Sequence, residues 1–257
     1  MPGARAARLS GLKAQIAALE AGTRTLNPVL PFGDARVDGC LAGGGLNLGR
    51  WHELGGEGAE VETAACVAAF TAALARPLVT NGEIVWVLRR DDLFAPGLAG
   101  LGLPPGRLIQ VCARDEAEVL AAIEDALGTV GVAAVVGEVE AVSLTAGRRL
   151  QLACERHGAT GLVIRRRPFG GAGKGSASGS ASASRWKIAP APSQAPPDVP
   201  GLGPPRWKVE LERSRGGRPG GWLVELNEAA DDPHPFRVVR DLADLGLAPE
   251  EPVRRAG

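Results

Sequence analysis

The chain has 257 residues, 45% of them hydrophobic and 23% charged, which is enough for one large domain or two small ones with a substantial core. Lys and Arg together number 29, as do Asp and Glu, so the zero net charge provides no whole-chain case for binding nucleic acid or a membrane. No apolar run approaches the ~20 residues of a membrane span, and the apolar residues near the N-terminus are too spaced for a signal peptide.

The first predicted element is a helix over residues 5–20. Its apolar residues recur three and four positions apart, on one narrow stripe: Leu9, Leu12, Ile16 and Leu19. The stripe either packs on the chain's own domain or binds a partner. Two heptads are too few to predict a coiled coil. We assign residues 1–29 to this helix and a linker.

From about residue 49 the pattern becomes an alternation of strands and helices, which predicts an α/β fold. The expected strands cover residues 50–54, 83–88, 107–112, 132–136 and 160–164. The expected helices cover residues 60–75, 116–127 and a segment from a Ser143 cap to His157. The first of these helices carries Val61, Ala65, Ala68 and Ala72. This order predicts a mostly parallel sheet flanked by helices on both faces.

After residue 165 the composition changes. Gly/Ser/Ala-rich and Pro-rich stretches predict flexible insertions at about 168–184 and 190–204. An Arg-Trp-Lys triplet occurs twice, at 185–187 and 206–208, and the second copy opens a predicted antiparallel hairpin over 207–213 and 221–226. We therefore expect a core over residues 30–228 and a C-terminal tail over 229–257, polar apart from one short apolar patch (Phe236, Val238, Val239), that frays at its end.

The four cysteines lie in mostly apolar segments, and none belongs to a Cys-x-x-Cys pair: Cys40, Cys66, Cys112 and Cys154. No histidine lies at ligand spacing from them. We expect buried thiols in a reducing cytoplasm, with neither a disulfide framework nor a metal site.

The segment WHELGGEGAEVETAACVAAF has the strand, Gly-rich turn and helix of a phosphate-binding P-loop, in that order. Counted from Gly55, Glu60 replaces the second glycine, Val61 replaces the phosphate-binding lysine, and Glu62 replaces the Ser/Thr that holds Mg²⁺. Thr63 stands one position late. The candidate nucleotide-binding residues of this degenerate Walker A motif are Gly55, Gly56, Gly58, Val61 and Thr63. Since the turn is acidic, we expect no bound nucleotide and no other cofactor.

The other parts of an ATPase site are also missing. The acidic residue expected at the end of a later strand would fall near Gly137, and Glu138 is one position away. The 83–88 strand is followed by Arg89-Arg90-Asp91-Asp92 rather than by a water-activating glutamate. We therefore predict no catalytic residues and no ATP hydrolysis.

Two stretches resemble RecA recombinases. GGLNLGRWHELGG (44–56) resembles the lead-in to their ATP site, and WKVELERSRGGRPGGWLVEL (207–226) resembles the hairpin that closes their core. With the Leu-Pro-Phe-Gly at 30–33 and the two Arg-Trp-Lys triplets, residues 30–226 resemble the ImuA family and, more distantly, the cell-division inhibitor SulA. The resemblance implies a RecA-like, P-loop-type core that has lost hydrolysis.

The resemblance also implies a role in the bacterial SOS response. ImuA-like proteins act in translesion synthesis with an ImuB-like, inactive Y-family polymerase relative and an error-prone polymerase III alpha-type subunit. We expect a cytoplasmic, nucleoid-associated adaptor without membrane contact. Two alternatives stay open: an inhibitor of a filament-forming protein such as RecA or the division GTPase, and a nucleotide-dependent DNA-binding ATPase.

Direct DNA contact is a further expectation. The candidate basic residues lie after the 160–164 strand and in the hairpin: Arg165, Arg166, Arg206, Lys208, Arg213, Arg215 and Arg218. Phosphate contacts would make binding salt-dependent. The alternative is a solvated hairpin, because Glu210 and Glu212 alternate with the basic residues. Trp186, Trp207 and Trp222 either stack on bases or, as is commoner for strand tryptophans, cover the core.

Overall fold

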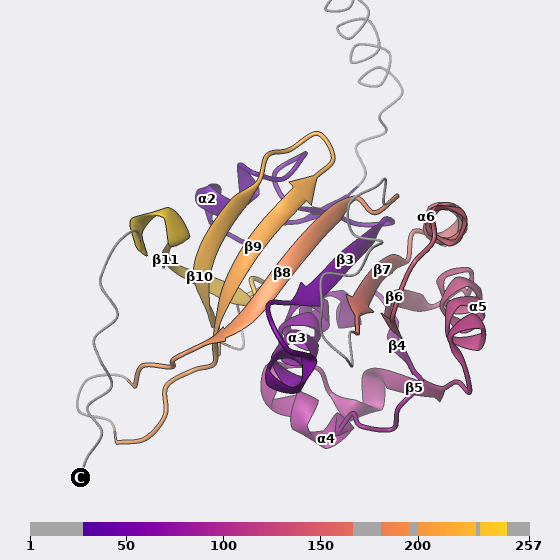
Figure 1. Ribbon diagram of the computed structural model, residues 1–257, viewed down its shortest axis with the longest axis horizontal. Helices are drawn as coiled ribbons and strands as arrows, with labels where there is room; N and C mark the ends of the chain where they lie inside the picture. The colour runs from indigo at the N-terminus through magenta and orange to yellow at the C-terminus, as the bar shows by residue number, and fades with distance from the viewer. Residues whose placement is uncertain (1–27, 167–180, 196–199, 230–231, 246–257) are drawn as a thin grey trace, which may run out of the picture.

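The computed structural model describes residues 28–166, 181–195, 200–229 and 232–245. Within these residues nine strands form one mixed sheet in the order β11-β10-β9-β8-β3-β7-β6-β4-β5 (Figure 1). The strands of this sheet are β3 (Trp51–Gly56), β4 (Glu83–Leu88), β5 (Leu108–Cys112), β6 (Val132–Val139), β7 (Thr160–Arg165), β8 (Ser184–Ala191), β9 (Arg206–Ser214), β10 (Gly220–Leu226) and β11 (Phe236–Asp241). A separate antiparallel ribbon pairs β1 (Val29–Leu30) with β2 (Leu46–Asn47).

Helices α3 (Glu60–Ala75), α4 (Ala95–Leu98), α5 (Glu116–Leu127) and α6 (Leu144–His157) connect the parallel strands, as the alternating pattern predicts, whereas α2 (Ala35–Asp38) lies between β1 and β2. The 3₁₀ turns are η1 (Arg76–Thr80), η2 (Ala99–Leu101), η3 (Pro105–Arg107) and η4 (Leu242–Leu245). The predicted cap of α6 is confirmed, because the Ser143 hydroxyl accepts a hydrogen bond from the Ala146 N–H. The helix ends at Gly158, whose φ of 77° is the left-handed conformation that glycine adopts readily.

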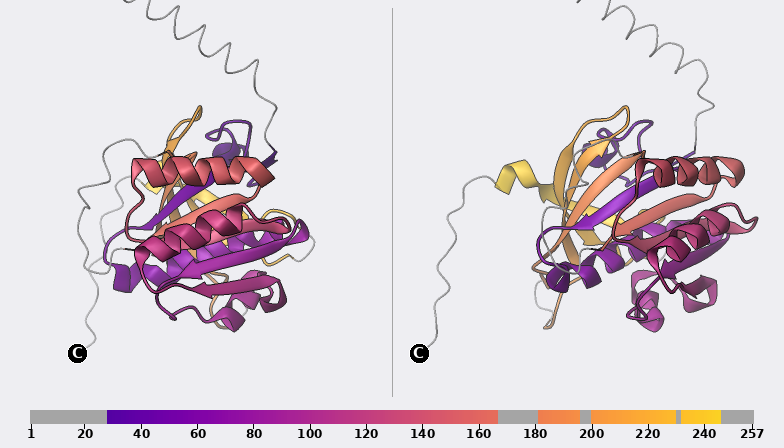
Figure 2. Two further views of the ribbon diagram at one scale, coloured as in Figure 1. Left: turned by 90° about the vertical axis from the view of Figure 1, so that its right-hand side faces the viewer. Right: turned by 45° about the vertical axis from the view of Figure 1, so that its right-hand side comes forward.

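In the parallel half of the sheet, strands β3, β7, β6 and β4 are buried on both faces, whereas the edge strand β5 is partly exposed. One face packs against α3, where Phe70 meets Trp86 and Leu162 in one apolar cluster. The other face packs against α5 and α6 in a second cluster that contains Val87 and Ile123 (Figure 2). Two covered faces explain the near-continuous apolar run of β4, since Trp86 and Val87 point to opposite clusters.

The antiparallel half, β8, β9, β10 and β11, is buried on one face only. Three tryptophans and a phenylalanine from these strands join the α3 cluster: Trp186, Trp207, Trp222 and Phe236. The tryptophans are thus core residues, as their commoner role suggests. No described helix covers the opposite face, which lies open on β8, β9 and β10 (Figure 1). Along β9 the burial alternates, with Trp207, Val209 and Leu211 inward.

The sheet extends beyond the predicted core boundary at residue 228. The segment assigned to a fraying tail contains β11, which pairs antiparallel with β10, and Phe236 stacks on Phe70 at a ring-centroid distance of 4.5 Å. Arg76 stabilises the connection, since its guanidinium donates to the carbonyls of Asn227 (2.8 Å) and His234 (3.1 Å). The tail prediction was wrong here because these contacts join positions far apart in the sequence.

The insertion predicted at 168–184 is shorter at its C-terminal end. Residues 181–184 are buried, and the Ala183 N–H donates to the Trp51 carbonyl at 2.8 Å. Strand β8 (Ser184–Ala191) then runs through the first Arg-Trp-Lys triplet and into the start of the second predicted insertion. Residues 167–180 and 196–199 lie outside the described residues, as does the predicted 5–20 helix with its stripe Leu9, Leu12, Ile16 and Leu19.

Helix α3 has the predicted bounds, and of the four residues named on it only Ala72 is fully buried. Val61 is 93% exposed and Ala65 is also exposed, whereas Thr63, Val67 and Phe70 are buried. An alanine-rich helix has no clear apolar stripe, so its rotation is decided by what it packs against. The stretch Glu60–Thr80 is long and apolar enough to cross a membrane by length and composition, and 50% of the 18-residue window that meets this test is buried in the fold. Core helices of soluble proteins pass the same test.

The cysteine expectation is only partly met. Cys40 and Cys154 are buried, Cys66 is half-buried and Cys112 is exposed on the edge strand β5. Burial raises the pKa of Cys66 to about 11 and that of Cys154 to about 12, which keeps both thiols protonated at neutral pH. The prediction was wrong at Cys112 because an edge strand leaves part of an apolar segment in contact with solvent.

Candidate functional site: an ion-paired edge of the parallel sheet

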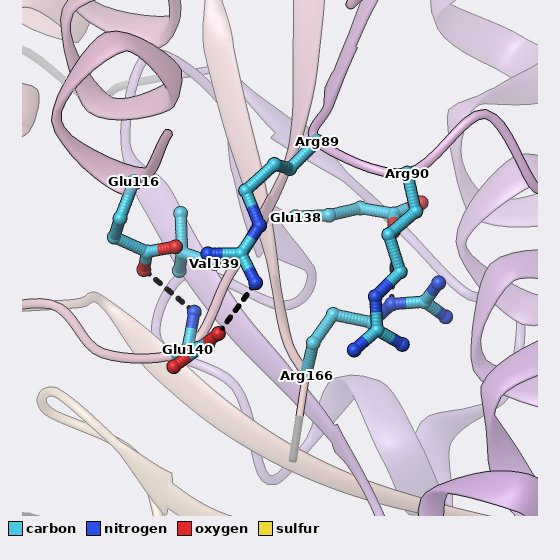
Figure 3. Close-up of a pocket in the computed structure, with 7 residues that line it drawn as sticks. All are labelled: Arg89, Arg90, Glu116, Glu138, Val139, Glu140 and Arg166. Carbon is cyan, nitrogen blue, oxygen red and sulfur yellow. Dashed lines mark hydrogen bonds and ion pairs between the residues drawn. The ribbon is translucent and has the colours of Figure 1, made fainter. Parts of the chain in front are cut away.

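The carboxyl ends of β3, β4, β6 and β7 meet at one edge of the sheet, and α3 begins there. Ligands of open α/β sheets bind at this edge. Two shallow hollows lie at it, each with a cavity volume of only about 20 Å³. The first is lined by the loop between β3 and α3, including Gly56, Gly58 and Thr63, and the second by residues at the ends of β4, β6 and β7 and by Glu116 of α5 (Figure 3). Arg166 lines both.

We call the turn between β3 and the start of α3, residues 55–63, the degenerate loop, after the motif predicted there; it is a tight turn. Gly56 approaches Thr63 so closely that a Cβ at Gly56 would lie 2.2 Å from the Thr63 Oγ1, and Gly58 has a φ of 95°. Thr63 donates its hydroxyl to the Ala59 carbonyl at 3.0 Å, within its own helix. Val61, at the lysine position, projects into solvent. The turn keeps its glycines for these close contacts and for a positive φ.

Arg166 joins three acidic residues from three elements. Its Nε lies 3.0 Å from Glu138 Oε2 and 3.6 Å from Glu60 Oε1, and its Nη2 lies 2.5 Å from Asp92 Oδ2. Only 13% of the Arg166 side chain is exposed. The guanidinium therefore connects the first turn of α3, the end of β6 and the loop after β4. The Arg166 guanidinium thus lies beside the N-terminus of α3 and is surrounded by the carboxylates of its three partners.

Glu138 is engaged on both oxygens. Its Oε1 accepts from the Trp86 indole N–H at 2.8 Å, and its Oε2 pairs with Arg166. Burial raises the pKa of Glu138, while the Arg166 guanidinium opposes that rise. Within the described residues no group of three or more His, Cys, Asp or Glu side chains could hold a metal ion.

The neighbouring Arg165 belongs to a second buried cluster. Glu53 of β3 is paired by the strands on each side of it, with Arg165 of β7 at 2.8 Å and Arg185 of β8 at 3.3 Å. The Glu53 side chain is only 5% exposed, so its negative charge is stabilised by the two arginines rather than by water. Arg165 also donates to the Glu140 carbonyl at 3.0 Å.

The second hollow has an exposed arginine at its rim. Arg89 donates to Glu140 Oε1 at 2.9 Å, and the Glu140 N–H donates to Glu116 at 2.6 Å (Figure 3). Arg90, exposed in the same loop, lies 3.4 Å from Glu60. The arginines after β4 are thus paired with acidic residues after β6 and in α3.

The lysines of the two Arg-Trp-Lys triplets both pair with an acidic residue of the degenerate loop. Each tryptophan points into the core, and each lysine points to the open face and pairs with Glu57, Lys187 at 2.8 Å and Lys208 at 3.1 Å. Glu210 accepts from both lysines. The hydrogen bond from Lys187 is the main cause that lowers the pKa of Glu57, and Lys208 contributes. The loop acid is therefore bound to β8 and β9.

The residues predicted to contact DNA do not form one free basic surface. Arg206 pairs with Glu225 at 2.7 Å, and Arg213 donates to the Ser182 carbonyl at 2.9 Å. Arg165, Arg166 and Lys208 are paired as described above. Arg215 and Arg218 are exposed in the β9–β10 turn, on a different element from Arg165 and Arg166.

Sequence reasoning missed Glu53 and Arg185, which pair with each other in the second buried cluster. An acidic residue inside an apolar strand was the available signal for Glu53, since burial of a carboxylate requires a cation nearby. Lys187 was visible only as part of a repeated triplet. The partners of all three come from strands that are distant in sequence.

Comparison with known proteins provides close relatives. The chain is 62% identical over 244 residues to "Protein ImuA" in two strains of Caulobacter vibrioides, and the match covers 93% of this chain and 100% of each relative. The crystal structure of SulA from Pseudomonas aeruginosa is similar at 24% identity and a TM-score of 0.39, and the match covers 45% of this chain and 96% of that one. No protein-family model matches the chain.

Proposed function

The chain belongs to the ImuA family, and from that premise we propose that it is a non-catalytic, RecA-like accessory protein of SOS-induced translesion DNA synthesis. It works as an adaptor between an inactive Y-family polymerase relative and an error-prone polymerase III alpha-type subunit. It acts in the cytoplasm and joins the nucleoid on DNA damage.

One observation supports the non-catalytic part most directly. Arg166, held by Glu60, Glu138 and Asp92, lies at the edge where a nucleotide would bind in an α/β sheet of this kind. Val61 replaces the lysine that would reach the phosphates. A triphosphate entering this edge meets the carboxylates of Glu57, Glu60 and Glu62 and must break ion pairs that are already formed.

The RecA-like part is supported by the sheet order and by the position of the loop. Five parallel strands with helices on both faces lead into an antiparallel extension, and the degenerate loop joins β3 to α3. The fold alone does not specify an activity, so the functional argument depends on the site and on the family.

The test of the non-catalytic part is ATP turnover by purified protein. We expect none in the unmodified chain, and none after Val61→Lys, because Glu62 and the Glu60–Arg166–Glu138 ion pairs remain. Nucleotide binding measured by calorimetry serves as the companion readout. Turnover that survives repurification of the unmodified protein would overturn this part of the proposal.

The test of the adaptor part is co-purification of tagged protein from cells after DNA damage. We expect a Y-family polymerase relative together with an error-prone polymerase subunit. Recovery of RecA or the division GTPase without either polymerase would instead favour an inhibitor of filament formation and would contradict the adaptor.

A further inference from the structure

The outer face of α6 carries an alternation of leucine and arginine. Leu144, Arg148, Leu152 and Arg156 recur at four-residue spacing, so they lie one above another along the helix. We call these four residues the α6 ridge. Leu144 is 50% exposed and Leu152 58% exposed, while Arg148 and Arg156 are both exposed.

The α6 ridge is separate from the face that holds the helix in the fold. The buried residues of α6 are Gly147, Leu150, Ala153 and Cys154, which pack with α5 and the parallel strands. At 100° per residue their mean direction is opposite to that of the ridge. No described element covers the ridge, and α6 runs along the outside of the molecule (Figure 2). The two leucines therefore contribute nothing to the core.

The two arginines of the ridge have no ion pair with any described residue. Their neighbours differ from them, since Arg149 pairs with Glu124 of α5 at 2.6 Å and Glu155 pairs with Arg50 at 2.5 Å. The only acidic residue of α6 is thus already engaged. The ridge presents apolar side chains beside two arginines that form no ion pair within the described part of the chain.

We propose that the α6 ridge is a docking surface for an acidic amphipathic helix of another protein. Such a helix would place apolar side chains against Leu144 and Leu152 and carboxylates against Arg148 and Arg156. Helix-in-groove recognition uses anchors at this spacing, and bidentate arginine–carboxylate pairs add specificity to the apolar contact.

Two other occupants fit the ridge less well. A second copy of α6 would bring further arginines to the ridge, and its one carboxylate, that of Glu155, is engaged with Arg50. A nucleic acid would use the arginines but leave both leucines against a phosphate backbone. The apolar and cationic residues together favour a protein helix that is both apolar and acidic.

The inference rests on the proposed function in one respect, since it takes the protein to act by binding other proteins. The first experiment therefore uses a defined probe and the full chain. The probe is a designed helical peptide in which leucine and glutamate alternate at four-residue spacing, and binding is followed by fluorescence anisotropy. A peptide of the same spacing with lysine in place of glutamate is its counterpart.

We expect saturable binding of the acidic peptide, with amide NMR shifts centred on residues 144–156. Leu144→Asp/Leu152→Asp and Arg148→Glu/Arg156→Glu should each weaken it by about tenfold or more, and the arginine variant should gain binding to the lysine peptide. Val130→Asp and Arg240→Glu, on exposed positions elsewhere, are the matched controls. All four positions of the ridge are exposed, so thermal unfolding should remain that of the unmodified chain.

Equal binding by the controls and the ridge variants would overturn the inference. Loss of binding to a DNA oligonucleotide in Arg148→Glu/Arg156→Glu, without loss of peptide binding, would also overturn it. Co-purification separates this inference from the adaptor function. If the unmodified chain and the arginine variant recover the same polymerases equally, the adaptor stands and the ridge fails. If neither polymerase is recovered while peptide binding behaves as expected, the ridge stands and the adaptor fails.

Discussion

The parallel and antiparallel halves of the sheet are made differently, although they share one apolar cluster against α3. The parallel half buries both faces, so Trp86 and Val87 are both inaccessible. The antiparallel half buries Trp186, Trp207 and Trp222 on one face and leaves Lys187 and Lys208 on the other. The ion-paired side chains therefore gather where helices no longer cover the sheet. These places are the carboxyl edge of the parallel half and the open face of the antiparallel half.

This comparison explains how the degenerate loop is held in place. Between the two halves lies the turn after β3, and each half contributes cations to it. Arg166 from the parallel half pairs with Glu60, while Lys187 and Lys208 from the antiparallel half pair with Glu57. The acidic loop is therefore stabilised by the chain's own basic residues.

The sharpest test of the two-face difference is a matched pair of charge insertions. Val87→Asp places a carboxylate in the α5/α6 cluster and should cost more than about 4 kcal/mol of unfolding free energy. Leu223→Asp, on the open face of β10 and opposite Lys208, should cost about 1 kcal/mol or less. Urea unfolding measures both. Similar losses in the two variants would mean that the antiparallel half is also covered on its second face.

Removing the shared acid at the junction should have the next largest effect. Glu53→Ala leaves Arg165 and Arg185 without their carboxylate in a buried setting, and we expect a loss of about 3–5 kcal/mol. Arg237→Ala is the control, because its pair with Glu225 is long, at 3.9 Å, and 69% of the Arg237 side chain is exposed. That variant should stay within about 0.5 kcal/mol of the unmodified chain. Equal losses would contradict the assigned role of Glu53.

A buried histidine links the halves and makes stability depend on pH. His52 Nε2 lies 2.8 Å from the Asn47 carbonyl oxygen, which can only accept, so Nε2 carries the hydrogen. Nδ1 therefore accepts from the Ser184 hydroxyl at 2.7 Å, and the same hydroxyl oxygen accepts from the Trp186 indole N–H. Burial lowers the pKa of His52 from 6.5 to about 4. Between these values the unfolded chain binds a proton that the folded chain does not.

The stability that His52 contributes above pH 6.5 is therefore lost as pH falls from 6.5 to about 4, and the loss should reach about 3 kcal/mol. Urea unfolding at about pH 7 and about pH 4.5 measures it. His52→Gln removes the titrating group, so its stability should change less over the same interval. An unchanged slope in that variant would assign the pH dependence to other groups.

The smallest effect is expected on the open face. Lys187→Met and Lys208→Met each remove one partner of Glu57, and the side chains involved are about one third exposed. Solvent screening limits each loss to about 0.2–1 kcal/mol, and the difference should shrink at high salt. A loss of several kcal/mol would show that this face is shielded from solvent.

Local sequence determined much of the architecture. The apolar run of β4 required cover on two faces, the alternation of β9 required cover on one, and the Ser143 cap marked the start of α6. The prediction of a degenerate Walker A motif was also made from local sequence, because it depends on residue type at a known spacing. These features are local, and helix or strand periodicity reveals them.

Tertiary structure alone decided which charges meet. Arg166 and Glu60 are far apart in the chain, as are Lys208 and Glu57, and nothing in their flanking residues specifies the pairing. It also decided that α3 turns Val61 to solvent and that Phe236 completes the α3 cluster from beyond the predicted boundary. The physical reason is common to all of these: burial and ion pairing depend on neighbours in space, which the strand order of the sheet brings together.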